Sequence, residues 1–126
     1  MRRTILLAVL TMCLTFKIEA QAILIFEETT FDFGSFKESQ KQVHDFVFSN
    51  TGDEPLIIQQ AYSSCGCTVA SYPKESIEPG AKAKLTVTYN GKGKFPGHFK
   101  KAVTVISSAA NKNARVYIEG TMVADD

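Results

Sequence analysis

The sequence of 126 residues contains no tryptophan, and it has only two histidines and three cysteines. Because imidazoles and thiols are the ligands that transition metals prefer, we expect neither a metal site nor another cofactor. No paired-carboxylate, Ser/His/Asp or phosphate-loop arrangement is present either, since Asp45, Glu54 and Glu119 are scattered over predicted outward faces. The sequence therefore predicts a protein that is not an enzyme.

The sequence also lacks an apolar run of the roughly 20 residues that a membrane span needs. Its N-terminal run, Ile5 to Phe16, has 12 residues and follows Arg2 and Arg3. Small residues at Ala20 and Ala22 then suit a signal peptidase, so residues 1–22 are predicted to be a signal peptide. Cleavage after Ala22 is the preferred site and cleavage after Ala20 the second.

Two alternatives for residues 1–22 remain open. The segment could be retained as an N-terminal anchor or buried helix, or Cys13 could be lipidated, since Leu10-Thr11-Met12-Cys13 loosely resembles a lipidation motif. Against lipidation, the apolar run continues beyond Cys13 to Phe16. We therefore expect export to the periplasm or medium, without a transmembrane segment after cleavage.

The mature chain, residues 23–126, has a length suited to one domain. Loss of Arg2, Arg3, Lys17 and Glu19 leaves 11 of 14 basic and 12 of 13 acidic residues, a net charge near −1. So little charge creates no field that would attract nucleic acid, and we expect no nucleic-acid partner.

Short runs in which apolar and polar residues alternate recur about every dozen residues, and no helical stripe is found. The first, Ile23 to Phe33, is expected to break at Glu27-Glu28 into two segments and to end at Gly34. The other runs are 42–50, 55–62, 82–89, 99–106 and 115–123. The pattern predicts an all-β, immunoglobulin-like, two-sheet antiparallel sandwich of about seven strands.

The alternation also predicts the core between the two sheets. The residues that face it are Phe46, Phe48, Leu85, Val87, Val103, Val105, Val116 and Ile118.

Several segments together resemble a known family. They are Phe31-Asp32-Phe33-Gly34, residues 44–52 (HDFVFSNTG), Pro55-Leu56, residues 63–68 (SSCGCT) and Ile77-Glu78-Pro79-Gly80. This succession resembles an exported bacterial family of domains of unknown function, number fifteen seventy-three. The resemblance implies an immunoglobulin-like fold related to pilus-chaperone and sperm-protein domains, which mostly bind other proteins, and it implies no biochemical activity.

Cys65 and Cys67 are the sharpest chemical feature of the mature chain. In an oxidising compartment each has only the other as an intramolecular partner, and a bend at Gly66 would bring them within disulfide distance. A local disulfide without catalytic role, two buried thiols, a thiol-redox or metal site, and intermolecular pairing all remain open. His44 is expected at the core rim with a backbone hydrogen bond, and His98 in solvent.

Lys92, Lys94, Lys100 and Lys101 are predicted to form a basic hairpin with interleaved aromatic residues. The hairpin could contact a polyanion or an acidic partner. Alternatively, its lysines only keep an edge strand from pairing with other chains, which is the favoured interpretation.

The main functional hypothesis is an exported, non-enzymatic binding or structural module of the cell envelope. It would bind an unidentified protein or envelope component through its loops or an open sheet edge. The competing hypothesis is a small envelope thiol-redox or metal-handling protein that acts through Cys65 and Cys67.

Overall fold

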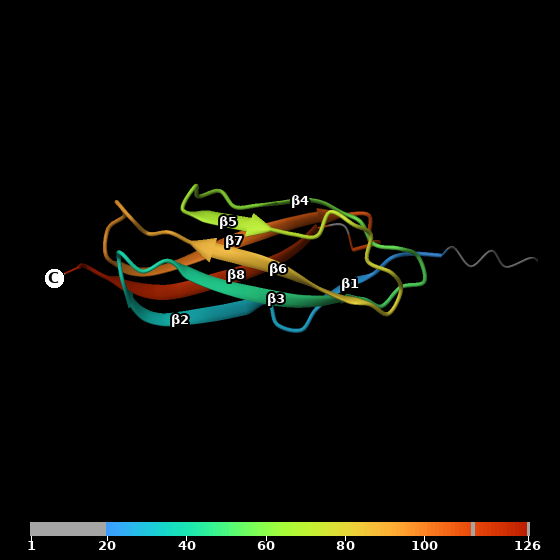
Figure 1. Cartoon of the computed structure of the whole chain (residues 1–126), viewed down its shortest axis with the longest axis horizontal. Coiled ribbons are helices and arrows are strands. Elements are labelled where there is room, and N and C mark those ends of the chain that lie inside the picture. Colours follow the sequence, from blue (N-terminus) through green and yellow to red (C-terminus); the bar gives the residue numbers. More distant parts are fainter. Residues whose placement is uncertain (1–19, 112, 126) are drawn as a thin grey trace, which may run out of the picture.

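The structure, a computed structural model, describes residues 20–111 and 113–125. In these residues the chain forms two stacked β-sheets of four strands each (Figure 1). The strands are β1 (Leu24–Phe26), β2 (Thr30–Lys37), β3 (Gln42–Asn50), β4 (Ile58–Tyr62), β5 (Thr68–Ser71), β6 (Lys82–Tyr89), β7 (Gly97–Ser107) and β8 (Asn113–Val123). The first sheet has the order β1-β3-β6-β5 and the second the order β2-β8-β7-β4. Neighbouring strands are antiparallel except β2 and β8, which are parallel.

The predicted immunoglobulin-like sandwich is confirmed, and several strand bounds follow the alternation closely. β3 and β6 begin and end at the residues that the pattern marks. The first run breaks at Glu27-Glu28 as expected, because β1 pairs with β3 whereas β2 crosses to the second sheet and pairs with β8. One broken run therefore supplies an edge strand to each sheet.

One expectation about the strands is wrong, and one strand is missed. Gly34 does not end a strand, because β2 continues to Lys37 after a bulge at which Gly34 adopts a φ of 72°. Glycine takes this left-handed conformation without the steric cost that a Cβ brings. β5 was not predicted at all, because it has only four residues and depends on pairing with β6.

The predicted core is confirmed. All eight residues that the alternation assigns to it are at most 1% exposed. Phe26 packs edge-on against Phe46 and Phe48, with ring centroids 6.5 and 5.5 Å apart. Aromatic rings in this geometry gain attraction beyond the burial of their area.

Asn50 is a fully buried polar residue that fastens one end of the sandwich. Its side-chain oxygen accepts hydrogen bonds from the backbone N–H groups of Ile23 and Gly52, at 3.2 and 3.0 Å. Its amide nitrogen donates to the carbonyls of Glu54 and Ile77, at 2.6 and 3.0 Å. The turn predicted after β3 is thus joined by one side chain to the start of the domain and to the loop before β6.

Candidate binding end of the sandwich

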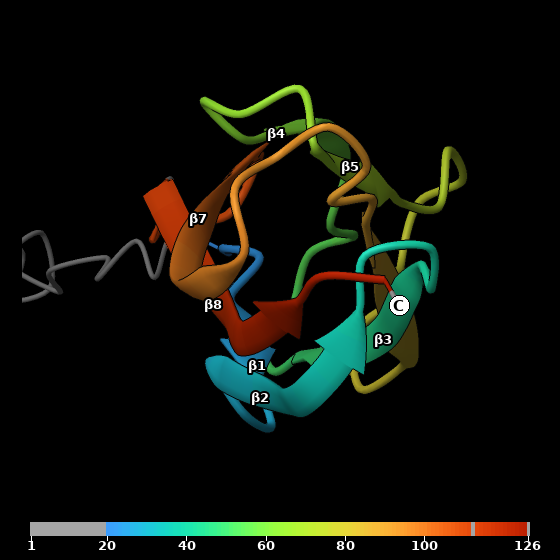
Figure 2. The ribbon, with the colours of Figure 1, turned by 90° about the vertical axis from the view of Figure 1, so that its left-hand side faces the viewer.

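Three loops and the C-terminal residues gather at the end of the sandwich opposite Asn50. These are residues 38–41, 63–67, 90–96 and 124–125, which we call the disulfide end (Figure 2). Strand register brings them together. Tyr89, the last residue of β6, pairs with the first residues of both β3 and β5, and Met122 of β8 pairs with Phe36 and Gly97.

A disulfide joins Cys65 and Cys67 in the loop between β4 and β5, as the local-disulfide alternative predicts. Their Cα atoms are 5.2 Å apart, within the usual range for disulfides. Cys65 is half-buried and Cys67 is 6% exposed. The Cys67 carbonyl accepts a hydrogen bond of 2.8 Å from the Asn90 N–H, which ties this loop to residues 90–96.

Residues 90–96 are not the predicted hairpin. They cross from β6 in the first sheet to β7 in the second, so strands that follow one another in the chain lie in different sheets. β7 lies between β8 and β4, but β4 pairs only with its last four residues. Among the described residues, the first part of β7 thus has a strand partner on one side only, and Lys100 and Lys101 border this partly open edge.

The crossover is held to the body of the sandwich through its first half. Gly91 is buried so closely against Met122 that a Cβ added to it would lie 2.2 Å from the sulfur. The Lys94 N–H donates to the Gly91 carbonyl at 2.9 Å, which closes a turn. Gly93, with a φ of 81°, donates its N–H to the Glu38 carboxylate at 2.9 Å. The loop therefore has a defined course.

Phe95 lies at the far side of this fastened turn and is 97% exposed. The nearby Phe99 behaves differently, because its ring stacks on Tyr89 with centroids 4.0 Å apart and also contacts Phe36. Burial in this cluster raises the pKa of the Tyr89 hydroxyl. The aromatic residues that the sequence groups together are thus divided into a buried cluster and one exposed ring.

The four lysines do not form one patch. Lys92 and Lys94 are exposed on the loop beside Phe95. Lys100 lies on the outer face of the second sheet with its ammonium 5.1 Å from the Tyr117 ring. Lys101 is half-buried and has the inward parity of Val103. Of the four lysines, only Lys92 and Lys94 lie on the same loop as Phe95 and can contact a partner together with it.

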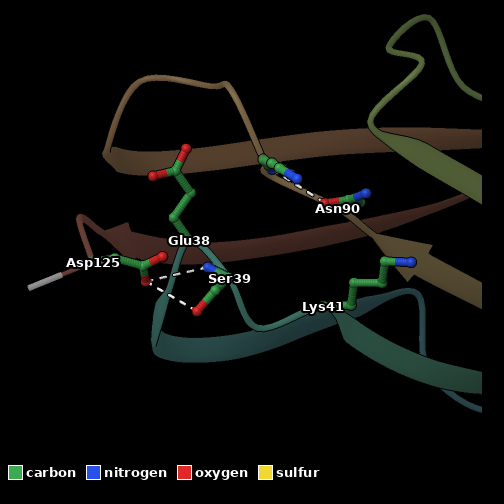
Figure 3. Close-up of a pocket in the computed structure, with 6 residues that line it drawn as sticks. Glu38, Ser39, Lys41, Asn90 and Asp125 are labelled. Carbon is green, nitrogen blue, oxygen red and sulfur yellow. Dashed lines mark hydrogen bonds between the residues drawn. The ribbon is translucent and has the colours of Figure 1, made fainter.

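A surface pocket of about 490 Å³ opens between the turn before β3, the crossover and the C-terminal residues (Figure 3). One wall is fixed by Ser39, whose N–H and hydroxyl both donate to the Asp125 carboxylate, at 3.3 and 3.0 Å. Sequence reasoning missed this pocket because nothing in the spacing links residues so far apart. Its lining carries both signs of charge: Glu38, Ser39, Lys41, Asn90, Lys92 and Asp125.

The two histidines lie in different sheets. His44 stacks on Phe31 with ring centroids 3.6 Å apart, and its Nε2 bonds the Glu28 carboxylate, so the expected backbone partner is wrong. The His98 side chain is 61% exposed, as expected, and its Nε2 lies 3.7 Å from Glu119. In residues 20–111 and 113–125, no three His, Cys, Asp or Glu side chains are grouped to hold a metal.

Comparison with known proteins places the fold. A family model described as "Protein of unknown function (DUF1573)" matches residues 24–122. No curated protein matches the chain. Within the described part of the chain, no helix is long and apolar enough to cross a membrane.

Three solved structures illustrate the likeness. A protein of unknown function from Porphyromonas gingivalis W83 has 16% identity and a TM-score of 0.70, over 86% of this chain and 50% of that one. The PapD-like domain 7 of human CEP192 has 9% identity and a TM-score of 0.64, over 91% and 97%. The periplasmic chaperone SfaE has 15% identity and a TM-score of 0.56, over 82% and 57%. The chain thus spans about half the length of the Porphyromonas protein, and these identities establish the fold alone.

Proposed function

The chain belongs to the DUF1573 family of proteins of unknown function, and on that premise we propose that it is an exported, non-enzymatic binding module of the cell envelope. Its partner is a protein or another envelope component, and the contact is made at the disulfide end. Export is supported by Arg2, Arg3 and the 12-residue apolar run that follows them. A binding role is supported by the likeness to PapD-like domains and to the periplasmic chaperone SfaE.

The single observation that carries the proposal is a 97% exposed phenylalanine on a loop of defined course. Burying a phenylalanine side chain is worth about 1.5–3 kcal/mol, which corresponds to roughly tenfold to a hundredfold in affinity. Because Gly91 and Gly93 already hold the first half of the loop in place, less backbone freedom remains to be lost on binding. Phe95 is therefore suited to act as an apolar anchor.

The surroundings of Phe95 indicate the chemistry of the partner. Lys92 and Lys94 are exposed on the same loop. An exposed apolar ring that shares its loop with two exposed lysines fits a surface that has a small apolar pocket with a carboxylate-rich rim.

The proposal is tested by placing a photo-crosslinking amino acid at position 95 in the exported protein. Position 57 is the matched control, because Ile57 is also an exposed apolar residue, at 48%, but lies beyond Asn50 at the other end of the sandwich. We expect a specific adduct from position 95 and none from position 57. The partner identified in the adduct is then titrated with purified protein. Phe95→Ala should weaken binding at least tenfold and Ile57→Ala should leave it unchanged, whereas equal affinities would refute the proposal.

The disulfide supports a second candidate, a thiol-redox protein. Cys65 is half-buried whereas Cys67 is buried, so Cys65 is the more accessible of the two to an incoming thiolate. In such a reaction a dithiol is oxidised to a disulfide, and Cys65 and Cys67 take up the two electrons and two protons. Turnover of a dithiol by the wild type but not by the Cys65→Ser, Cys67→Ser variant would support this candidate over the binding module.

A further inference from the structure

The sandwich begins before β1, within the segment that the sequence assigns to the leader. Ala22 is 4% exposed and belongs to the core. Its carbonyl accepts a hydrogen bond of 2.9 Å from the Ala110 N–H, and the Ile23 carbonyl accepts one of 3.0 Å from Thr51. Removing Ala22 would therefore take away part of the folded domain.

Among the described residues, which begin at Ala20, Gln21 is the first that the fold holds through its backbone. Its N–H donates to the Asp53 carboxylate at 2.7 Å, and its carbonyl accepts from the Asp53 N–H at 2.9 Å. Gly52 makes room for this strand-like contact, because a Cβ on it would lie 2.0 Å from the Gln21 carbonyl oxygen. Ala20 is exposed and forms no hydrogen bond with other described residues. In the part of the chain that the structure describes, backbone hydrogen bonding to the sandwich thus begins at Gln21, directly after the Ala20–Gln21 bond.

We propose that a signal peptidase hydrolyses the Ala20–Gln21 bond, and that the new α-ammonium group of Gln21 forms an ion pair with Asp53. Water supplies the hydroxyl that completes the Ala20 carboxyl group and the hydrogen that completes the Gln21 amine. The Gln21 nitrogen already lies 2.7 Å from Asp53 Oδ1, so the positive charge of the new amine forms within ion-pair distance of a carboxylate. This inference rests on the proposed export.

Cleavage after Ala22 would have the opposite effect. It would remove both Gln21–Asp53 hydrogen bonds and the buried Ala22 side chain. It would also put a charged amine at Ile23, whose nitrogen lies 3.2 Å from the oxygen of the fully buried Asn50. This oxygen can accept a hydrogen bond from the amine, but as part of a neutral amide it carries no charge to pair with it, unlike the Asp53 carboxylate beside Gln21.

The preference of the peptidase acts against this, because small residues three and one before the cut favour cleavage after Ala22. Cleavage after Ala20 leaves Ile18 at the position three before the cut. The local sequence motif therefore favours cleavage after Ala22, whereas the fold favours cleavage after Ala20.

The precursor is expressed with its own leader, and the protein recovered from the envelope is analysed by intact mass. We expect a chain that begins at Gln21 and keeps its free amine. A chain that begins at Ile23 would overturn this inference and leave export standing, whereas recovery of uncleaved precursor would overturn export itself. A mass lower by one ammonia would show cyclised Gln21, which has no charge, and would overturn the ion pair.

The ion pair is tested with Asp53→Asn and with Glu54→Gln as the matched loss of charge at the next residue. Asn still accepts a hydrogen bond, so the difference reports the charge. Because the pair is exposed, we expect Asp53→Asn to raise the unfolding equilibrium constant about two- to fivefold at low salt. The effect should fade as added salt screens the pair. Equal behaviour of the two variants at low salt would refute the ion pair.

Discussion

Replacing Asn50 by alanine is the sharpest test of how the end of the sandwich opposite the disulfide end is held together. The side chain is fully buried and makes four hydrogen bonds to backbone groups of Ile23, Gly52, Glu54 and Ile77. The variant would leave those four groups without this partner and open a cavity too close to the core for bulk water.

The expected loss follows from those contacts. A buried donor or acceptor that loses its partner costs about 1–3 kcal/mol, and some of the four groups will find new partners or a bound water. If two remain unsatisfied, the free energy of unfolding falls by about 2–6 kcal/mol. This is a large share of the roughly 5–15 kcal/mol that stabilises a typical domain.

The assay is urea unfolding of the mature protein, with Asn90→Ala as the control. Asn90 is exposed, and its side-chain oxygen accepts one local hydrogen bond from the Lys92 N–H. The control should lose about 1 kcal/mol or less. If Asn50→Ala loses no more than Asn90→Ala, the four hydrogen bonds do not fasten this end and the reasoning is refuted.

Three further predictions concern the core, the disulfide and pH. Phe48→Ala should lower the free energy of unfolding by about 3–5 kcal/mol in urea melts, and a loss below about 1 kcal/mol would mean that the strand register is wrong. The Cys65→Ser, Cys67→Ser variant should stay folded by circular dichroism and lose at most about 1.6 kcal/mol, because closing so short a loop removes little entropy from the unfolded chain; an unfolded variant would contradict this. Burial raises the pKa of Tyr89 above its ordinary value of 10.0, so its contribution is present below about pH 10 and is lost as the pH rises further. Tyr89→Phe should therefore flatten the alkaline fall in stability, and an unchanged slope would show that other groups cause it.

The sequence is most informative where one property repeats along a strand. In β6 polar and apolar residues alternate without interruption, and in β3 Phe46 and Phe48 share one face; the bounds and the buried faces of both strands are predicted correctly. β5 is missed because four residues are too few to establish a period, and its strand conformation depends on hydrogen bonds to β6. The bulge in β2 is missed for a related reason, since a glycine that ends a strand and one that bends it look the same in sequence.

The candidate site is less predictable, because it consists of loops brought together from distant parts of the chain. The sequence correctly marks Cys65 and Cys67 as a local pair, since residues that are only two positions apart in the chain are necessarily close in space. It groups Phe95 with Phe99, and only the packing of Phe99 on Tyr89 separates the buried ring from the exposed one.

The sequence by itself determined that this protein is an all-β sandwich, which residues of its regular strands face the core and that Cys65 and Cys67 lie near each other, because these follow from local periodicity and spacing. Only the tertiary structure decided that residues 90–96 cross between sheets, since a hairpin and a crossover differ in which strand each partner joins and not in local composition. It alone also connects Gln21 to Asp53 and Asn50 to Ile77. Such contacts depend on the path of the whole chain, and no short segment encodes them.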